Sequence, residues 1–326
     1  MTVTRRITLA LAATAVAAAA TTATALAGPA DRPAPAPAPK AAGELRVLSM
    51  NLWHGGAQVN DGLTKQLAVI EKHQPDVVGF QETSGHSAKD LAAKLGWDHW
   101  QSNGSLGIIS RFPITSKAET ISGGAGAGVR IRIDESSGQE VELWTAHLGY
   151  TPYGPYDACF DQMPVDEIMK REAESGRTGQ ATELAAKLKD KIANADETPV
   201  LVVGDFNSPS HLDWTDANKH CGYGKVDWPA TKIVADAGLK DSYREAHPDP
   251  ASDPATTWSP VYPKHDGSTG EVEPQDRIDF INYAGSKLSV RDSSVIVEGS
   301  PKPYPDHADN AWPTDHAAVL TTFAVG

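Results

Sequence analysis

Short apolar segments that end in a polar residue recur along this 326-residue chain, and the clearest is PVLVVGDFNSP at 199–209. Its continuous apolar run, bounded by proline and glycine, predicts a strand that is covered on both faces. Asp205 and Asn207 alternate around Phe206, so their side chains should point to one face at the end of this strand. Taken alone, the same residues are equally typical of a strand followed by an Asx turn.

Similar patterns predict the other elements. Strands are predicted over 45–53, 76–83, 105–114, 129–134, 140–148, 276–283, 290–299 and 316–325, and helices over 63–73, 87–95, 178–193 and near 233–237. Ser87 should cap the second helix and Gly96 should end it. The glycine-rich segment 121–128 is interpreted as a turn, because no GK[ST] helix follows it, and 149–177 as a long loop. Strands interleaved with helices predict an α/β fold of two stacked sheets with helices outside.

The N-terminal segment is typical of an exported protein. Residues 1–27 combine a basic start at Arg5 and Arg6 with an alanine-rich apolar run and the sequence ALA at 25–27. This arrangement predicts a cleaved secretory signal peptide, and both twin-arginine and general secretory export remain open. Residues 28–43 read as a Pro/Ala-rich linker. The catalytic domain is therefore expected over 44–326, without a transmembrane segment and in a secreted, extracellular protein.

The net charge limits the classes of binding partner, and the cysteine content indicates a disulfide. The formal net charge of −13 becomes −15 once the two arginines of the signal peptide are removed. This balance disfavours a protein that holds polyanions by bulk charge, so nucleic acid is a possible but not a favoured partner. Cys159 and Cys221 are the two cysteines of the chain, and export favours a disulfide between them over two free thiols. We expect a monomer.

Polar residues of the kinds used in phosphoryl chemistry stand at or just past six predicted strands. They are Asn51, Glu82, His147, the Asp205/Asn207 pair, Asp279, and Asp315 with His316. Six such positions indicate that strand ends converge on one site. Their oxygen atoms suit Mg²⁺, with Mn²⁺ or Ca²⁺ as alternatives. The chain has no Cys-x-x-Cys or His-Glu-x-x-His spacing, which disfavours zinc.

The segments around these residues carry a resemblance to a known family. In chain order they read NLW at 51–53, QE at 81–82, TAHL at 145–148, GDFN at 204–207, RIDFI at 277–281 and TDH at 314–316. Together they resemble the endonuclease/exonuclease/phosphatase superfamily, which includes deoxyribonuclease I, abasic-site endonucleases, bacterial sphingomyelinases and inositol polyphosphate phosphatases. The resemblance covers 45–325 and implies a DNase I-like, four-layered α/β sandwich with a metal site at one edge of two mixed sheets. With the signal peptide, it implies a secreted bacterial member.

The resemblance implies a role for each matching residue on the metal side of the site. Glu82 is similar to the main metal ligand of the family, with Asn51 and Asp315 close to the same ion. Asp205 matches the aspartate that orients or deprotonates the attacking water, and Asn207 matches the side chain that holds a phosphate oxygen.

Three further matches concern the phosphate. His316 matches the histidine that stabilises the pentacoordinate phosphate or assists protonation, Asp279 matches the carboxylate that fixes its ring, and His147 matches a second phosphate-facing histidine. Independently of the resemblance, Arg177 and Gln180 stand at the start of a predicted helix. They either reach the substrate phosphate or form a solvated helix face.

Simpler structural roles compete with these assignments. Asn51 could only bond the sheet edge, His147 could be a satisfied core histidine, and Asp279 could form a salt bridge with Arg277. For Glu82, a carboxylate buried at a strand end without a partner would cost several kcal/mol, which favours a ligand role.

The sequence thus predicts an enzyme, a Mg²⁺-dependent phosphoric ester hydrolase that uses direct attack of water. We expect a small-molecule or lipid-derived phosphomonoester or phosphodiester as substrate. The alternatives are a secreted endonuclease and a sphingomyelinase-like phospholipase C, which would need exposed aromatic residues for membrane contact. Trp214, Trp228 and the Tyr153/Tyr156 loop are the candidates for that contact. A binding protein that has retained the fold is the non-enzymatic alternative.

Overall fold

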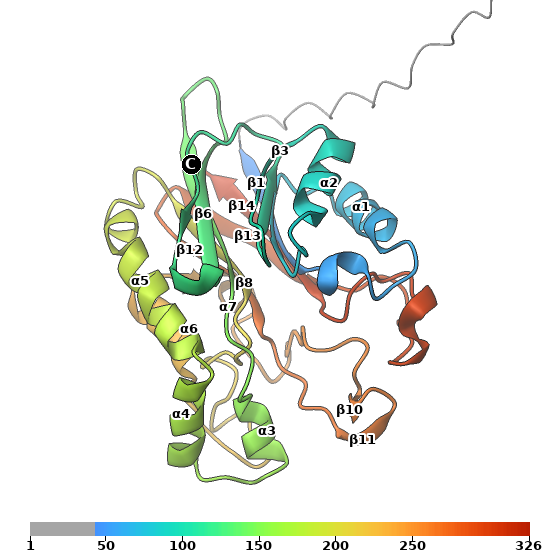
Figure 1. Cartoon of the computed structure of the whole chain (residues 1–326). Coiled ribbons are helices and arrows are strands. Elements are labelled where there is room, and N and C mark those ends of the chain that lie inside the picture. The colour runs from blue at the N-terminus through green and yellow to red at the C-terminus, as the bar shows by residue number, and fades with distance from the viewer. Residues whose placement is uncertain (1–42) are drawn as a thin grey trace, which may run out of the picture. The chain divides into compact units, whose positions relative to one another are not determined.

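The computed structural model describes residues 43–326, so the predicted signal peptide and all but the last residue of the predicted linker lie outside the described residues. Two six-stranded sheets form the centre of the described part (Figure 1). The first contains β1 (Glu44–Asn51), β2 (Val77–Gln81), β3 (Asp98–Gln101), β4 (Gly107–Ser110), β13 (Leu288–Ile296) and β14 (Ala318–Val325). The second contains β5 (Glu119–Thr120), β6 (Gly126–Arg132), β7 (Glu140–His147), β8 (Val200–Asp205), β9 (Lys240–Asp241) and β12 (Asp279–Ala284).

Both sheets are mixed. The strand orders are β13-β14-β1-β2-β4-β3 and β5-β6-β7-β8-β12-β9. In the first sheet β1 and β2 are parallel, in the second β7 and β8 are parallel, and the remaining neighbours are antiparallel. A separate two-stranded hairpin consists of β10 (Lys264–Asp266) and β11 (Thr269–Val272).

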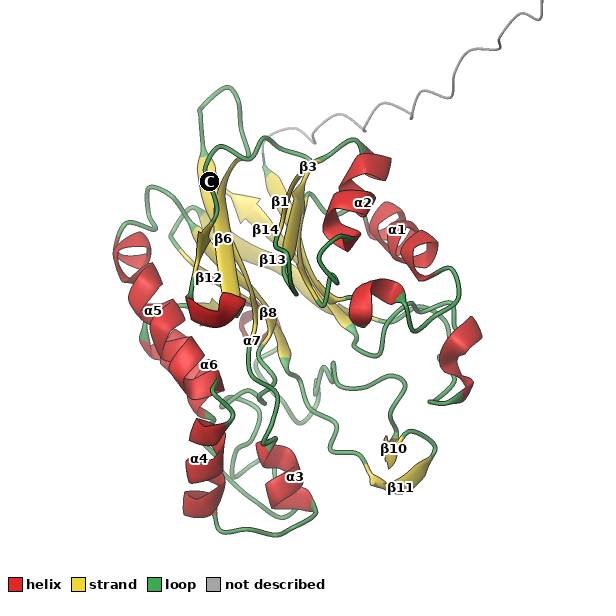
Figure 2. Ribbon diagram, in the orientation of Figure 1, coloured by secondary structure: helices red, strands yellow, loops and turns green. Residues whose placement is uncertain are grey.

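Helices lie on the outer faces of the sheets and beyond one of their ends (Figure 2). They are α1 (Gly62–His73), α2 (Ser87–Leu95), α3 (Gly154–Cys159), α4 (Val165–Glu174), α5 (Arg177–Ala193), α6 (Pro229–Asp236) and α7 (Ser242–Ala246). Short 3₁₀ helices occur at His54–Gly56, Ser122–Gly124 and Asp306–Asp309. Helices α1 and α2 pack on the first sheet, and α5 and α6 pack on the second.

The alternation of side chains along β8 shows how the layers are held together. Val200 and Val202 belong to the apolar cluster under α5, whereas Leu201 and Val203 belong to the cluster between the two sheets. Every residue of β8 is buried, as its continuous apolar run predicts. The predicted four-layered α/β sandwich is confirmed.

The two sheets also approach closely enough for polar contacts between them. Gln81 of the first sheet donates from Nε2 to the Thr145 hydroxyl of the second at 2.9 Å. Gly79 makes this approach possible, because a Cβ atom built there would lie 2.2 Å from Cγ2 of Val203 on the facing sheet. The glycine is therefore a packing requirement of the sandwich.

Two local predictions were wrong, and one strand begins earlier than predicted. Segment 149–177 is no plain loop but contains α3 and α4, and α4 has two buried residues, which is too few to show helical periodicity. The N-cap of α2 is His86, and the Ser87 hydroxyl donates instead to the Gly55 carbonyl. The glycine-rich segment continues past its turn into β6, where Gly128 leaves room for the indole of Trp144.

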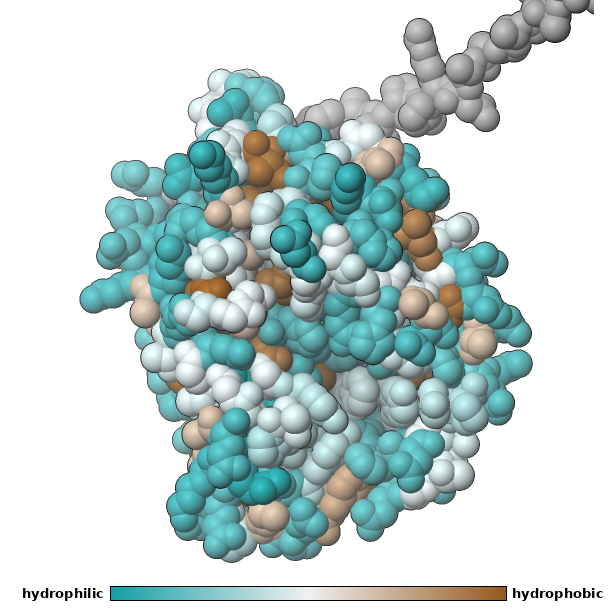
Figure 3. All heavy atoms as spheres, viewed as in Figure 1, coloured by the Kyte–Doolittle hydropathy of each residue, from teal (hydrophilic) through white to brown (hydrophobic). Residues whose placement is uncertain are grey.

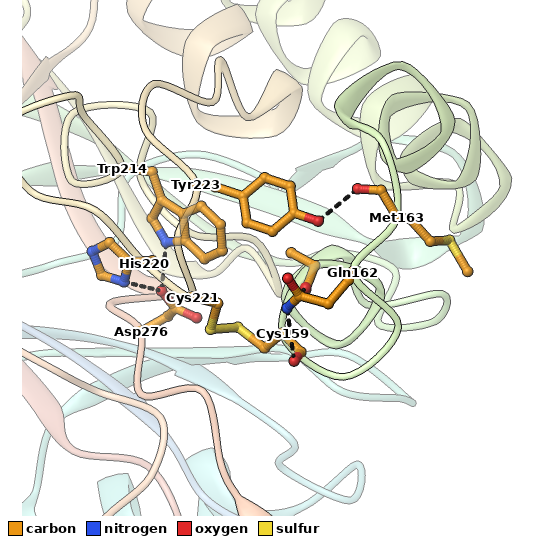
Figure 4. Close-up of a disulfide and its surroundings, with 9 residues drawn as sticks. Cys159, Gln162, Met163, Trp214, His220, Cys221, Tyr223 and Asp276 are labelled. Atoms are coloured by element: carbon orange, nitrogen blue, oxygen red, sulfur yellow. Dashed lines mark hydrogen bonds and ion pairs between the residues drawn. A yellow bond between two sulfur atoms is a disulfide. The ribbon is translucent and has the colours of Figure 1, made fainter.

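The predicted disulfide between Cys159 and Cys221 is present, with the two Cα atoms 5.1 Å apart (Figure 4). It joins the end of α3 to the loop before α6, and its neighbours Trp214 and Trp228 form a small apolar cluster with residues of α4. Both tryptophans are buried, at 1% and 0% exposure, so their predicted role as candidates for membrane contact was wrong.

The surface of residues 43–326 carries no exposed apolar hairpin of the kind that inserts into a membrane. Val272 is 74% exposed at the end of the β10–β11 hairpin, but its neighbours in the hairpin are polar or glycine. The face shown in Figure 3 is mainly hydrophilic, with isolated hydrophobic residues. No helix among residues 43–326 is long and apolar enough to cross a membrane.

We expect Gly79→Ala to lower the free energy of unfolding by about 1–3 kcal/mol, because the added methyl group forces the facing sheets apart. Chemical denaturation measures this loss. Gly104→Ala is the matched control, since a Cβ there meets nothing within 4 Å. Equal stabilities of the two variants would contradict the packing role of Gly79.

Asp276 should make stability depend on pH. Burial raises the pKa of its carboxyl to about 7 from an ordinary value of 3.8, despite a hydrogen bond from Trp214 Nε1 at 2.7 Å. The folded protein thus binds this proton more tightly than the unfolded chain, so the contribution is present below about pH 4 and is lost as the pH rises through about 7. Relative to wild type, Asp276→Asn should gain on the order of 1–3 kcal/mol between pH 4.5 and pH 8. Thermal unfolding at both pH values measures the gain, and a pH-independent difference would contradict it.

Candidate active site

The predicted strand-end residues come together at one edge of the two sheets. Asn51 ends β1, His147 ends β7 and Asp205 ends β8, while Glu82 directly follows β2. In each parallel pair the carboxyl ends lie side by side, which is where open α/β sheets place their ligands. The antiparallel strands β12 and β14 start at the same edge and supply Asp279 at the beginning of one and the Asp315–His316 pair just before the other.

The Asp205 carboxylate lies at the centre of this group and is 1% exposed. Its Oδ2 accepts a hydrogen bond from Asn51 Nδ2 at 3.1 Å. The same oxygen lies 3.6 Å from His147 Nε2 and 3.7 Å from His316 Nε2. The other oxygen, Oδ1, accepts from the backbone N–H of Asn207 at 2.8 Å.

This environment makes Asp205 more basic than an ordinary aspartate. Burial raises the pKa of its carboxyl and the charge of Asp279 raises it further, while His316 and His147 lower it without cancelling the shift. A carboxylate with a raised pKa is better able to accept a proton from a bound water.

His316 is held between two carboxylates. Its Nδ1 lies 2.9 Å from Asp279 Oδ2, and its Nε2 faces Asp205. Burial alone would lower the pKa of the imidazole, but Asp279 and Asp205 outweigh it and raise the pKa well above its usual value. The raised pKa favours the imidazolium form of His316, which can donate from both nitrogens. Arg277 pairs with Asp213 and Asp241, so a salt bridge between Arg277 and Asp279 is excluded.

Glu82 occupies the more open side of the site, with 22% of its side chain exposed. It adopts a left-handed backbone conformation, with φ 55°. One carboxylate oxygen accepts from the His54 backbone N–H at 2.9 Å, and the other lies 3.4 Å from Asn51 Nδ2. Although burial would raise its pKa, His147 and the His54 N–H hold the pKa of Glu82 below its usual value. The group stays ionised.

The carboxylate of Asp315 adds to an excess of negative charge beside Glu82. It is 6% exposed and receives a long hydrogen bond, 3.5 Å, from the Thr314 hydroxyl. Burial raises its pKa to about 7, and Glu82 contributes to the rise while His316 opposes it. The carboxylates of Glu82 and Asp315 and the Asn51 amide are hard oxygen donors, a set that fits a divalent cation.

A second group of potential ligands exists deeper in the site. Among the described residues, Asp205, Asp279 and His316 each bring one such atom to within 4.8 Å of the others. His316 as an imidazolium has no free lone pair, however, so these residues fit a proton-bearing chain of groups better than they fit a cation. The cation is better placed on the side of Glu82.

Several contacts in the site carry no signal in the sequence. The Ser105 hydroxyl lies 2.8 Å from His147 Nδ1 and accepts from the backbone N–H of Glu82 at 3.1 Å. The Thr257 hydroxyl accepts from the backbone N–H of Asp279 at 3.1 Å. Because these side chains come from loops distant in sequence, no local pattern identifies them.

Arg177 does not contact the substrate position as predicted, and it is no solvated helix residue either. Its side chain is fully buried, at 0% exposure, and forms an ion pair with Glu172 at 2.9 Å. Its Nη1 donates to the carbonyl of Asn207 at 2.7 Å. Gln180 accepts from the backbone N–H of Gly149. Arg177 therefore fixes the loop that carries Asn207. The Asn207 side chain donates from Nδ2 to the Leu148 carbonyl at 3.0 Å. Its backbone is left-handed, with φ 49°.

A row of rings borders the site from the His316 side to the Asn51 side. This aromatic row consists of Trp258, Tyr262, Tyr304, His307 and Trp53, with successive ring centroids 5.3, 5.6, 5.0 and 4.7 Å apart. The indole of Trp258 is 5.0 Å from the His316 ring, and its Nε1 donates to Glu273 at 2.7 Å.

This fold, with carboxylates and histidines at one sheet edge, is the architecture of DNase I-like proteins. The chain belongs to the Endonuclease/Exonuclease/phosphatase family, whose profile matches residues 48–316. The family name covers enzymes that hydrolyse phosphate esters.

One relative is similar to this chain over most of its length. The uncharacterized Caenorhabditis elegans protein F14F9.5 is 33% identical over 291 residues, which covers 86% of this chain and 91% of the relative. The similarity therefore extends to an animal protein and is not restricted to bacteria.

Two solved structures share the fold. The structure of D. rerio TDP2 complexed with single strand DNA product has a TM-score of 0.57 and 17% identity, covering 86% of this chain and 98% of that chain. The human Nocturnin catalytic domain with bound sulfate anion has a TM-score of 0.55 and 16% identity, covering 87% and 95%.

We expect Asp279→Asn to lower the pKa of His316, because burial of the imidazolium then loses its main compensation. NMR titration of the ring in the presence of EDTA measures this shift independently of activity. Asp292→Asn, at an exposed position of β13, is the control and should leave the titration unchanged. A His316 titration that is the same in both variants would contradict the assigned charge state.

Proposed function

We propose that this chain is a secreted, divalent-metal-dependent phosphoesterase that hydrolyses a phosphate ester by direct attack of water. The observation that carries the proposal is the buried Asp205 carboxylate, whose Oδ2 lies between 3.1 and 3.7 Å from Asn51, His147 and His316. A basic carboxylate surrounded by donors of this kind can orient a water beside a phosphate. Family membership supports the same reaction class.

The remaining groups act on the phosphate. Asp205 accepts the proton of the attacking water, and His316 donates to the phosphoryl oxygens or to the departing oxygen. Asp279 holds the ring of His316 in place and keeps it charged. His147 and Asn207 are proposed to bind the phosphate oxygens. Because water attacks the phosphorus directly, no phosphoenzyme forms.

Glu82, Asn51 and Asp315 would hold the cation, for which Mg²⁺ is proposed and Mn²⁺ or Ca²⁺ are alternatives. When bound, such an ion polarises a phosphoryl oxygen and stabilises charge that develops during the reaction. The lowered pKa of Glu82 keeps its carboxylate available at neutral pH.

The charge of the site favours a small or lipid-derived phosphoester over long nucleic acid. Among residues 43–326, the side chains of the proposed site residues make their hydrogen bonds and ion pairs without a lysine or arginine. The net charge of −13 adds to this argument, since backbone recognition of nucleic acids relies on cationic side chains. Both phosphomonoesters and phosphodiesters remain within the proposal.

A secreted nuclease is the second candidate function. TDP2, which shares the fold, was solved with a single strand DNA product. The aromatic row supplies ring faces and edges near the site, and such residues support stacking of unpaired bases. A sphingomyelinase-like activity is less favoured, because Trp214 and Trp228 are buried. A binding protein without activity is disfavoured because the acidic and histidine side chains of the site are all retained.

Export is part of the proposal. The sequence of residues 1–27 has the features of a signal peptide, and the Cys159–Cys221 disulfide is typical of proteins in oxidising compartments. A secreted phosphoesterase could release phosphate or alcohol from extracellular material.

The purified protein should hydrolyse small phosphoesters in Mg²⁺ and lose this activity in EDTA. Asp205→Asn should lower kcat by about 10³-fold, because the variant lacks the proton acceptor, whereas Asp292→Asn should not. Duplex DNA, sphingomyelin and small phosphomonoesters and phosphodiesters are the substrates to compare. Rapid DNA cleavage with little turnover of small esters would overturn the substrate preference, and full activity of Asp205→Asn would overturn the assigned role.

A further inference from the structure

A small recess adjoins the phosphate side of the site. Its volume is about 40 Å³, and it is lined by Asn207, Tyr150, Tyr153, Tyr156, Trp258 and Ile278. Asn207 is the proposed phosphate anchor, and Trp258 contacts the ring of His316. A group attached to a phosphate bound at this site would therefore reach the recess directly.

The walls of the recess are held in place without a ligand. The buried Arg177 guanidinium donates to the carbonyls of Gly149 and Tyr150 at 2.9 and 3.0 Å, as well as to that of Asn207. The backbone at Tyr150 and at Asn207 is thus held by one cation. A binding surface that is already ordered costs little conformational entropy when it is occupied.

The opposite wall is fixed by a single carboxylate. Glu273 Oε1 accepts from the Tyr156 hydroxyl at 2.6 Å and from Trp258 Nε1 at 2.7 Å. Glu273 is itself buried, at 2% exposure. The two rings therefore cannot turn independently, and their separation is set by the protein.

The chemistry of the lining indicates what it receives. Four of the six lining residues are aromatic, and aromatic walls favour flat rings through stacked or edge-to-face contacts. Tyr153 is 6% exposed, so its ring forms the inner side of the recess. Tyr150 is 60% exposed and forms the outer side of the recess.

We propose that this recess binds a planar ring carried by the organic group of the phosphoester, so that the enzyme prefers ring-bearing small phosphoesters over alkyl or acyl-chain ones. The inference rests on the proposed function for the position of the phosphate. The recess is small and admits only the edge of one ring, and its aromatic lining favours a ring over an alkyl chain. The ring can be a nucleobase or a simple aryl group, which share this chemistry.

Binding measured without turnover tests the proposal. Isothermal titration calorimetry of the Asp205→Asn protein in Mg²⁺ compares phenyl phosphate with ethyl phosphate, and adenosine monophosphate with ribose 5-phosphate. We expect the ring-bearing member of at least one pair to bind about tenfold more tightly, which corresponds to about 1.4 kcal/mol. The first pair reports on a simple aryl group and the second on a nucleobase.

Variants then assign this preference to the recess. Tyr150→Ala, at an exposed position, should remove most of the preference and leave ethyl phosphate binding unchanged, while Tyr150→Phe should keep it. Tyr304→Ala is the matched control, because Tyr304 is also exposed, at 40%, but belongs to the aromatic row. No preference in either pair, or a preference that Tyr304→Ala removes and Tyr150→Ala does not, would overturn the proposal.

The proposed function can fail separately. If the wild-type protein hydrolyses none of the phosphoesters but the Tyr150-dependent ring preference is present, the recess stands and the catalytic assignment falls. If the protein hydrolyses phosphoesters but shows no ring preference, the catalytic assignment stands and the recess proposal falls.

Discussion

The buried carboxylate of Asp205 is the interaction on which the rest of the site depends. A negative charge at 1% exposure is costly unless nearby donors replace its lost hydration. Those donors come from both sheets, because Asn51 belongs to β1 and His147 to β7. The two sheets must therefore pack in one register and at one separation for the charge to be tolerated. The geometry of the site therefore depends on the separation and register of the two packed sheets.

The hydrogen bond between Asp279 and His316 likewise joins residues from the two sheets. Asp279 starts β12 in the second sheet, and His316 lies two residues before β14 in the first. The close approach at Gly79 and the Gln81–Thr145 hydrogen bond keep the sheets near enough for such contacts. Substitutions in the apolar layer between the sheets can thus alter distances in the site without touching it.

The fold and most of the site could be predicted because their signals are local. The apolar run before Asp205 defines a buried strand, and the alternation of Asp205 and Asn207 fixes the face of the carboxylate. Ser105 and Trp258 could not be predicted, because a serine or a tryptophan in a loop has no periodic pattern and acquires its neighbours through tertiary packing. Arg177 was misjudged for a related reason: sequence gives no indication that a charged residue at a helix start will be fully buried against Glu172.

The left-handed backbone of Glu82 and Asn207 has a consequence for evolution and engineering. For a residue with a side chain such as glutamate this conformation costs roughly 1–2 kcal/mol, which glycine would avoid. Selection for stability alone would therefore favour replacing Glu82, the residue proposed to hold the cation. If Glu82 holds the cation as proposed, the strain in its backbone is a loss of stability that accompanies the function. A stabilised variant obtained by screening on thermal tolerance should accordingly be checked first at these two positions.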